Sequence, residues 1–183
     1  MMTVYRSAEH GVMRAMNVDS ISLHKGAGWQ NKYKPDVWEA ERADNPCPMD
    51  RFDQLTQDSM TRSLLRRVLA PHHWQVLVAH FMVDLDGSTQ QQRMAAIAHL
   101  ARSAPGKSHH LFRTKCVTAW ATPRLPEAFM ALHTWDNADT PTPEKTLYRW
   151  RSDIRKWLEA ERDTAIASAW VILNEAELIA EAA

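Results

Sequence analysis

Between residues 142 and 158 the chain spaces its basic side chains as one face of a helix would. The basic stripe consists of Lys145, Arg149, Ser152 and Lys156, flanked by Tyr148 and Arg155. A rotation of about 100° per residue brings these positions to one side of a helix. The window 144–156 holds five basic and two acidic residues. The pattern therefore predicts a helix with a local excess of positive charge on one face.

Such a face is suited to an anionic polymer. Lysine and arginine displace counterions from phosphates, and arginine can also read guanine edges in the major groove. The hydroxyls of Thr146 and Tyr148 can hold phosphate oxygens. Arg151 lies at the apolar edge of the same helix, where its stem can pack while its charge reaches solvent, so we expect a lesser contact from it. A plain solvated helix face has the same pattern and stays an alternative.

Two further groups of side chains could contact a partner. Arg62, Arg66 and Arg67 form a second basic group, which we expect to be a solvated face, a flank of the phosphate contacts or a docking surface. Aromatic and basic residues also alternate within 17–48, a segment with little periodicity that we predict to be an irregular arm. Its candidate partner-binding residues are Trp29, Lys32, Tyr33, Lys34 and Trp38.

The sequence offers no convincing catalytic or metal site. It contains no GxSxG, P-loop or GxGxxG motif, and its nine histidines form no HExxH or compact Cys/His zinc pattern. Asp84 and Asp86 resemble the start of a calcium loop, but the remaining ligands do not follow at the required spacing. We therefore expect no enzyme activity, no cofactor and no bound metal.

The element that must position the basic stripe has the clearest start signal in the chain. Thr142 is a candidate N-cap, Pro143 suits the first helical position, and Glu144 favours the positive helix end. No further proline or glycine follows. We expect either one helix of up to about 40 residues, roughly 60 Å long if uninterrupted, or two helices joined by a bend near Arg162. Its apolar face is formed by Leu147, Trp150, Ile154, Trp157 and Leu158.

Helical spacing of apolar residues recurs before this helix. The expected helices cover residues 7–16, 50–69, 71–86, 88–102, 108–121 and 126–133, with Ser7 capping the first and Ser88 or Thr89 the fourth. Residues 125–135, a polar loop and the helix from 142 would form a helix-turn-helix-like unit with a stretched turn. The prediction is an all-α fold with an irregular N-terminal arm, a helical bundle containing this unit, and a long C-terminal helix.

Composition limits the class of protein. Residues 1–48 are assigned to the short helix and extended arm, and 49–183 to a helical DNA-binding domain. The 22 basic residues balance the 22 acidic ones, so nucleic-acid binding must rest on local clustering. Two isolated cysteines suit a reducing cytoplasm. No signal-peptide pattern and no apolar run of about 18 residues occurs, so we expect a soluble protein without membrane contact.

The layout resembles the Q-type late-gene transcription antiterminators of bacteriophages, and more loosely other phage helix-turn-helix regulators. The resemblance is carried by YRSAEHGVMRAM at 5–16, LAPHHWQVLVAHF at 69–81 and TLYRWRSDIRKWL at 146–158. It implies binding to a promoter-proximal DNA element, association with RNA polymerase and passage through terminators. Some of these proteins carry a zinc site of paired cysteines, which this sequence lacks.

The residues and the resemblance together predict a DNA-binding transcription regulator, with double-stranded DNA as its ligand and RNA polymerase as its suspected partner. The main contacts would come from Lys145, Arg149, Arg155 and Lys156. The alternative is a non-enzymatic adaptor that binds other proteins through its N-terminal arm and helical surface. Capture of a partner without nucleic acid would favour the adaptor.

Overall fold

The structure is a computed structural model that describes residues 4–23, 51–83, 86–122, 124–136 and 141–179. Within these ranges the elements are helical, which confirms the predicted all-α class. They are α1 (Ala8–Met16), α2 (Val18–Leu23), α4 (Arg51–Val68), α5 (Pro71–Phe81), α6 (Gly87–Ser103), α7 (His110–Ala121), α8 (Glu127–Met130), the 3-10 helix η2 (Leu132–Trp135) and α9 (Glu144–Glu175). None of the described helices is long and apolar enough to span a lipid bilayer.

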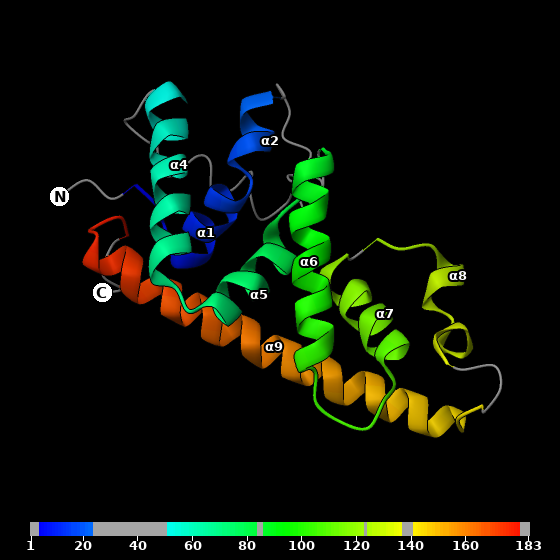
Figure 1. Ribbon diagram of the computed structural model, residues 1–183. Coiled ribbons are helices and arrows are strands. Elements are labelled where there is room, and N and C mark those ends of the chain that lie inside the picture. Colours follow the sequence, from blue (N-terminus) through cyan, green and yellow to red (C-terminus); the bar gives the residue numbers. More distant parts are fainter. Residues whose placement is uncertain (1–3, 24–50, 84–85, 123, 137–140, 180–183) are drawn as a thin grey trace.

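Helix α9 is the spine of the molecule, as Figure 1 shows. It has 32 residues and so runs for about 48 Å. The absence of proline and glycine after Pro143 lets it continue, and α1, α5 and α7 pack along it. Its buried side chains are Leu147, Ile154, Leu158, Ala165, Ala169 and Leu173. Their four- and seven-residue spacing is the stripe that an amphipathic helix turns toward a core.

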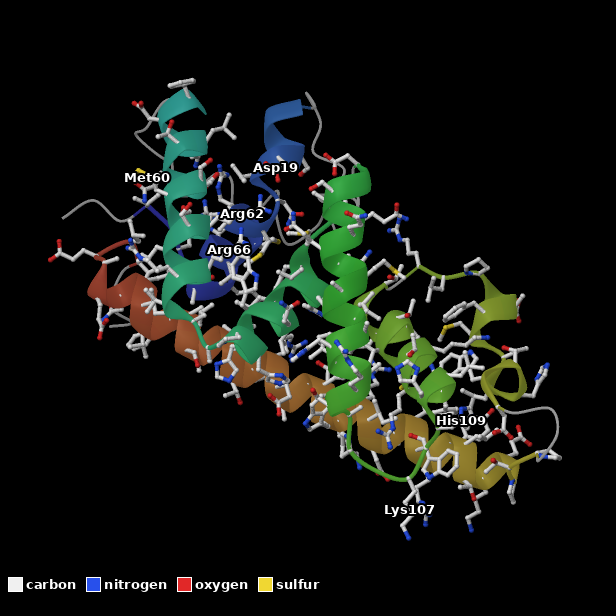
Figure 2. All side chains as sticks on the ribbon, in the orientation of Figure 1. Asp19, Met60, Arg62, Arg66, Lys107 and His109 are labelled. Carbon is white, nitrogen blue, oxygen red and sulfur yellow. The ribbon has the colours of Figure 1, made fainter. Side chains whose placement is uncertain are left out.

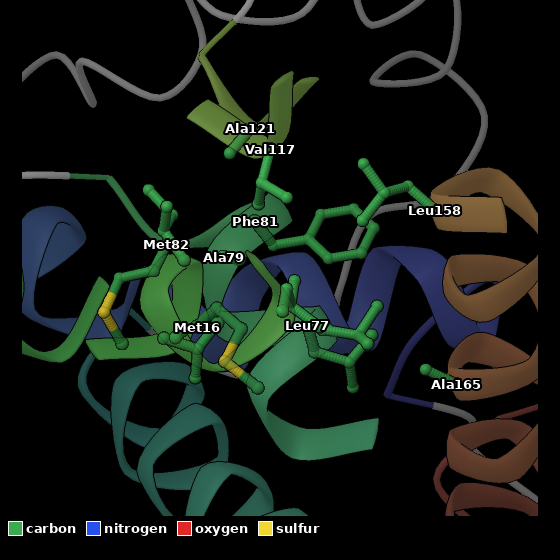
Figure 3. Close-up of a cluster of buried hydrophobic side chains, with 14 of the residues drawn as sticks. Met16, Leu77, Ala79, Phe81, Met82, Val117, Ala121, Leu158 and Ala165 are labelled. Carbon is green, nitrogen blue, oxygen red and sulfur yellow. The ribbon is translucent and has the colours of Figure 1, made fainter. Parts of the chain in front are cut away.

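Helix α5 lies at the centre of the bundle because it is apolar on nearly every side. Pro71 occupies its first turn, where the missing N–H costs no hydrogen bond. Val76, Leu77, Val78, Ala79 and Phe81 are buried. The helix contacts α9 on one side and α6, α1 and α7 on others. Figure 3 shows the resulting core, in which side chains of α1, α5, α7 and α9 meet.

The first helices differ in part from the prediction. Ser7 caps α1 as expected, and its hydroxyl accepts from the His10 N–H at 3.2 Å. Helix α2, however, occupies the beginning of the segment that the sequence predicted to be irregular. Buried Asn17 explains the difference, since its Nδ2 donates to the carbonyls of Met13 (2.8 Å) and Phe81 (2.9 Å). These bonds hold the α1–α2 junction against α5, which local periodicity does not encode.

The two ends of the described chain meet. The chain reverses after α9 at Glu177, whose φ of 58° is left-handed, and the Leu178 N–H donates to the Leu173 carbonyl at 2.9 Å. The Leu178 carbonyl then accepts from the N–H groups of Val4 (3.1 Å) and Tyr5 (2.9 Å). This short parallel bridge places α1 over the C-terminal end of α9.

The residues predicted to form a helix-turn-helix-like unit are found in α8, η2 and the N-terminal part of α9. Residues 125–135 form two short helices rather than one, since Pro126 is the N-cap of α8 and Ala131 between the two helices is extended.

The start of α6 also differs from the prediction. Asp86 caps it, accepting from the Thr89 N–H at 2.7 Å, and the Thr89 hydroxyl accepts from the Asp86 N–H at 3.1 Å. The predicted caps at Ser88 or Thr89 therefore lie inside the helix.

Candidate nucleic-acid interface

The N-terminal part of α9 is held firmly by its apolar face. Leu147, Ile154 and Leu158 are buried, with exposures of 3%, 1% and 0%. Trp150 packs edge-on against Phe112 of α7, with ring centroids 5.6 Å apart. Burying side chains of this size contributes about 1.5–3 kcal/mol each. The opposite face of the helix is thus presented on a rigid support.

That opposite face carries the predicted basic stripe. Lys145, Arg149, Ser152 and Lys156 are all exposed, and Tyr148 is 55% exposed beside them. In the described part of α9, ion pairs inside the helix join Arg155 and Arg162 to Glu159, and Arg162 to Asp163. None of these pairs involves Lys145, Arg149 or Lys156. Within the part of the chain that the structure describes, these three exposed charges have no carboxylate bound to them.

Arg155 is a weaker member of the stripe. Its side chain is 67% exposed, but its Nε lies 3.7 Å from Oε1 of Glu159 one turn later. A surface pair of this kind contributes little energy and is easily exchanged for another anion. Arg155 therefore remains available to a phosphate at a small cost.

Arg151 and Thr146 lie at the edge of the helix rather than on the stripe. The Arg151 guanidinium stands over the Trp135 ring, 5.7 Å from its centroid, and Arg151 is only partly exposed. This cation–π contact fixes the charge close to the protein. Thr146 is partly buried as well. Both residues sit where the predicted apolar and basic faces meet, so their contacts with a ligand would be secondary.

The start of α9 corrects the prediction for Thr142. Pro143 occupies the N-cap position, and no side chain caps the helix. The Thr142 N–H and hydroxyl instead donate to the carboxylate of Asp136, which also lies 3.1 Å from His109 Nε2. Thr142 was the better cap by residue type, but its N–H and hydroxyl bind Asp136, and its oxygen accepts no N–H from the first turn of α9. These bonds fasten the residue before α9 to the end of η2 and the start of α7.

The second basic group does not join the stripe. Arg62 donates to Asp19 of α2 at 2.6 Å, so it connects two helices instead of facing a ligand. Arg66 and Arg67 are exposed on α4. Helix α4 borders a groove with Ala176 and Leu178, at the far end of α9. Twenty residues of helix from Lys156 to that end span about 30 Å. Figure 2 shows Arg62 and Arg66 on the opposite side of α9 in this view from Lys107, which lies in the loop between α6 and α7.

The structure adds one cation that the sequence did not select. Lys107 is exposed in the loop between α6 and α7, and α7 packs against α9. The loop is fastened by Arg113, which donates to the Gly106 carbonyl at 2.5 Å and to Ser108 Oγ at 3.3 Å. The only signal for Lys107 in the sequence was a lysine beside a Pro-Gly turn, and this combination is too common to indicate binding.

The predicted partner-binding residues Trp29, Lys32, Tyr33, Lys34 and Trp38 lie outside the described residues.

A histidine chain links three helices on another part of the surface. His72 Nε2 lies 3.0 Å from Oε2 of Glu161, and His72 Nδ1 lies 3.2 Å from His99 Nε2. In a neutral His72 whose Nε2–H donates to Glu161, the other ring nitrogen accepts from His99. Burial lowers the pKa of His99, as do the charges of His72 and Arg102. The chain joins α5, α6 and α9.

No cluster of three or more His, Cys, Asp and Glu side chains suited to a metal ion occurs in the described ranges. Cys116 is buried beneath α9, and burial raises the pKa of its thiol to about 11. A thiol with such a pKa is a poor nucleophile and a poor metal ligand at neutral pH. The arrangement with the clearest chemical use is therefore the exposed basic face of α9.

Comparisons with known proteins give no relative for the chain. No protein-family model, no curated protein and no solved structure matches it.

Proposed function

We propose that this chain is a non-enzymatic DNA-binding transcription regulator that sets the outer face of α9 against the phosphates of duplex DNA. One observation carries the proposal: Lys145, Arg149 and Lys156 lie exposed on one helix face, and no carboxylate of the described residues is paired with them. Lys145 and Lys156 are eleven positions apart, which is about 16 Å along the helix. That length spans a major groove about 12 Å wide.

The rigid support of α9 favours this use. Its cations are offered by a helix whose other face is already buried, so binding does not have to order a flexible loop. Each phosphate neutralised releases counterions, and three such contacts give a slope of log K against log salt of about −2.7. Ser152 and Tyr148 add hydroxyls beside the cations that can bond phosphate oxygens. The expected binding is moderate and strongly dependent on salt.

The finer biological role rests on the resemblance of three segments to Q-type antiterminators. Two of them, 5–16 and 69–81, fall in α1 and α5, which supply core packing, and the third, 146–158, is the proposed DNA face. We extend the proposal to a phage-type antiterminator that loads onto RNA polymerase near a promoter. A run-off transcription assay across a terminator, with and without the protein, tests this extension.

DNA binding is tested by fluorescence anisotropy with a labelled duplex at several salt concentrations. Replacing both Arg149 and Lys156 by alanine removes two phosphate contacts and should flatten the salt slope by about 1.8. The matched control is Arg124→Ala. Arg124 is exposed in the connection between α7 and α8. This connection starts at Thr122, whose Oγ1 accepts from Arg93 in the first half of α6 at 2.8 Å.

The control should leave the affinity for the duplex and the salt slope unchanged, because α9 crosses the C-terminal end of α6, away from the connection that carries Arg124 (Figure 1). Equal slopes for the wild type and the Arg149/Lys156 variant would refute the proposal. So would duplex binding that is insensitive to salt in the wild type.

A further inference from the structure

A groove with mostly apolar walls opens between α4 and the turn that follows α9. Its volume is about 570 Å³, and Met60 and Leu64 line one wall while Ala176 and Leu178 line the other. Met60 is 62% exposed, although large apolar side chains are usually buried. Figure 2 shows Met60 on the opposite side of α4 from Asp19 of α2, so α2 leaves the groove open. The groove is thus accessible to an apolar side chain of a partner.

Both walls of the groove are fixed by bonds to the N-terminal segment. On the α4 wall, Thr61 is buried and its hydroxyl lies 2.9 Å from the Tyr5 hydroxyl. On the other wall, the Leu178 carbonyl accepts from the N–H groups of Val4 at 3.1 Å and Tyr5 at 2.9 Å. Tyr5 therefore holds the two walls at a set separation. A partner that enters the groove does not have to order it first, which favours binding.

The polar side chains on the α4 wall are already bonded within the helix. The hydroxyl of Ser59 donates to the Leu55 carbonyl at 2.9 Å, and that of Ser63 donates to the Ser59 carbonyl at 3.0 Å. The Gln57 amide donates to Thr61 Oγ1 at 3.3 Å. Covering these donors therefore costs little. The two serines are one turn apart and small, so a second helix can approach this wall closely.

The two rims of the groove carry opposite charges. Arg67 lines the groove near the end of α4, and Arg66 is exposed beside it. On the other rim, Glu175 and Glu177 are exposed and flank Ala176 in the chain. Within the described ranges, none of these four charged side chains takes part in an ion pair. A partner that matches both rims must itself carry both signs of charge.

Glu175 lies where a helix does not favour an acidic side chain. It is the last residue of α9, and the last turn of this helix holds no basic residue. The C-terminal end is the negative end of the helix dipole, so a cation is favoured there and a carboxylate is not. A lysine or arginine of a partner would neutralise the carboxylate and the helix end together. The same carboxylate repels phosphates, which favours a protein over nucleic acid or an anionic membrane as the occupant.

We propose that this groove binds an amphipathic helix of another protein, in addition to the proposed contact of α9 with DNA. The helix buries a leucine or an aromatic side chain between Met60 and Leu178, with a carboxylate toward Arg67 and a lysine or arginine toward Glu175. The α4 wall offers no strand edge, so an extended peptide cannot be added there as a strand. The groove lies about 30 Å along α9 from Lys156, so DNA and the partner helix can be bound at once.

Fluorescence anisotropy of the full chain with a labelled synthetic peptide tests the groove. The probe is a helical peptide of about 14 residues with leucines at i, i+4 and i+7, glutamates along one side of this stripe and lysines along the other. The wild type should bind it in the micromolar range. Peptides with glutamate on both sides, or lysine on both sides, should bind at least about tenfold more weakly, because each places like charges at one rim.

Variants of the rims and of the groove locate the contact. Glu175→Lys with Glu177→Lys makes both rims basic, so the peptide with glutamate on both sides should now bind at least about tenfold more tightly than the mixed probe. Lysine is favoured at a helix C-terminus, so this variant should fold. Met60→Lys places a charge in the groove and should weaken the mixed probe at least about tenfold. Arg124→Ala is the control and should bind the probe as the wild type does.

The Arg149→Ala and Lys156→Ala double variant should also bind the mixed probe normally, so failure of the groove and failure of DNA binding are separate results. The inference is overturned by a wild type that does not bind the mixed probe at several hundred micromolar, or by binding that Met60→Lys leaves intact. A charge preference that stays the same in the two-lysine variant, at a melting temperature equal to the wild type, also contradicts it. A dimer of the chain alone that Met60→Lys dissociates in sedimentation velocity would assign the groove to a second copy instead.

Discussion

Asp58 lies at the centre of a buried polar network that joins α1 to α4, and its removal should be costly. Asp58 is fully buried, and Arg14 binds it through Nε at 3.1 Å to both carboxylate oxygens and through Nη2 at 2.7 Å to Oδ2. The Tyr5 hydroxyl donates to Oδ1 at 2.9 Å and lies 2.9 Å from Thr61 Oγ1. Burial of Tyr5 and the charge of Asp58 raise the pKa of the phenol far above its usual value.

Replacing Asp58 by asparagine keeps the shape of the side chain but removes its charge. An amide NH₂ must then face the Arg14 donors, and the guanidinium, 14% exposed, loses its counterion. Leaving one partner of a buried ion pair uncompensated costs about 3–5 kcal/mol. A chain of this size loses roughly 2–4 °C of melting temperature per kcal/mol. The melting temperature should therefore fall by about 6–20 °C.

Urea denaturation followed by circular dichroism measures this loss, and a double-mutant cycle assigns it. Arg14→Leu with Asp58→Leu removes both charges, so the double variant should be less destabilised than the sum of the single ones by at least about 1.5 kcal/mol. Glu159→Gln is the surface comparison. It breaks the exposed ion pairs with Arg155 and Arg162 and should cost below about 1 kcal/mol. A loss for Asp58→Asn as small as that of Glu159→Gln would refute this assignment of the network.

Two predictions concern α1 and its surroundings. Burial, then the charges of nearby arginines, lowers the pKa of His10 from 6.5 to about 4. Between these two pH values the unfolded chain binds more protons than the folded chain, so the free energy of unfolding should fall by up to about 3 kcal/mol as the pH drops from 6.5 to 4. His10→Gln should flatten the pH dependence of the urea midpoint, and an unchanged pH dependence would contradict this prediction. Gly11→Ala adds a Cβ only 3.0 Å from Tyr5 Cδ2 and 3.1 Å from Leu173 Cδ1, and should cost about 1–2 kcal/mol despite the better helix propensity of alanine. Its control, Gly87→Ala, meets nothing within 4 Å and should be neutral or stabilising in the same thermal melts.

Much of the fold follows from local patterns in the sequence. Ser7 marks the start of α1 and Pro71 the start of α5, because each satisfies a local requirement of a helix N-terminus. The apolar stripe of α5 and the long run without proline or glycine after Pro143 also predicted their helices. Conversely, α2 was missed, since its placement depends on the bonds of Asn17 to Phe81 and Val83 far along the chain.

The candidate interface divides in the same way. Periodicity alone placed Lys145, Arg149 and Lys156 on one face, because their angular positions depend only on the geometry of a single helix. Whether an arginine is free depends on what folding brings near it. Arg62 meets Asp19, 43 residues earlier in the chain, and Arg151 meets the Trp135 ring, so neither could be assigned from spacing.

The sequence by itself determined the helical class, the long last helix and the angular arrangement of its charges, since all three are set by interactions within a few residues. Only the tertiary structure decided that Asp136 takes the donors of Thr142 and that the groove beside α4 lies about 30 Å along α9 from the basic stripe. It also decided that α4 exposes Phe52 and Met60 beside a groove. These outcomes depend on pairs of residues that are distant in the chain, and such pairs leave no periodic trace in a single sequence.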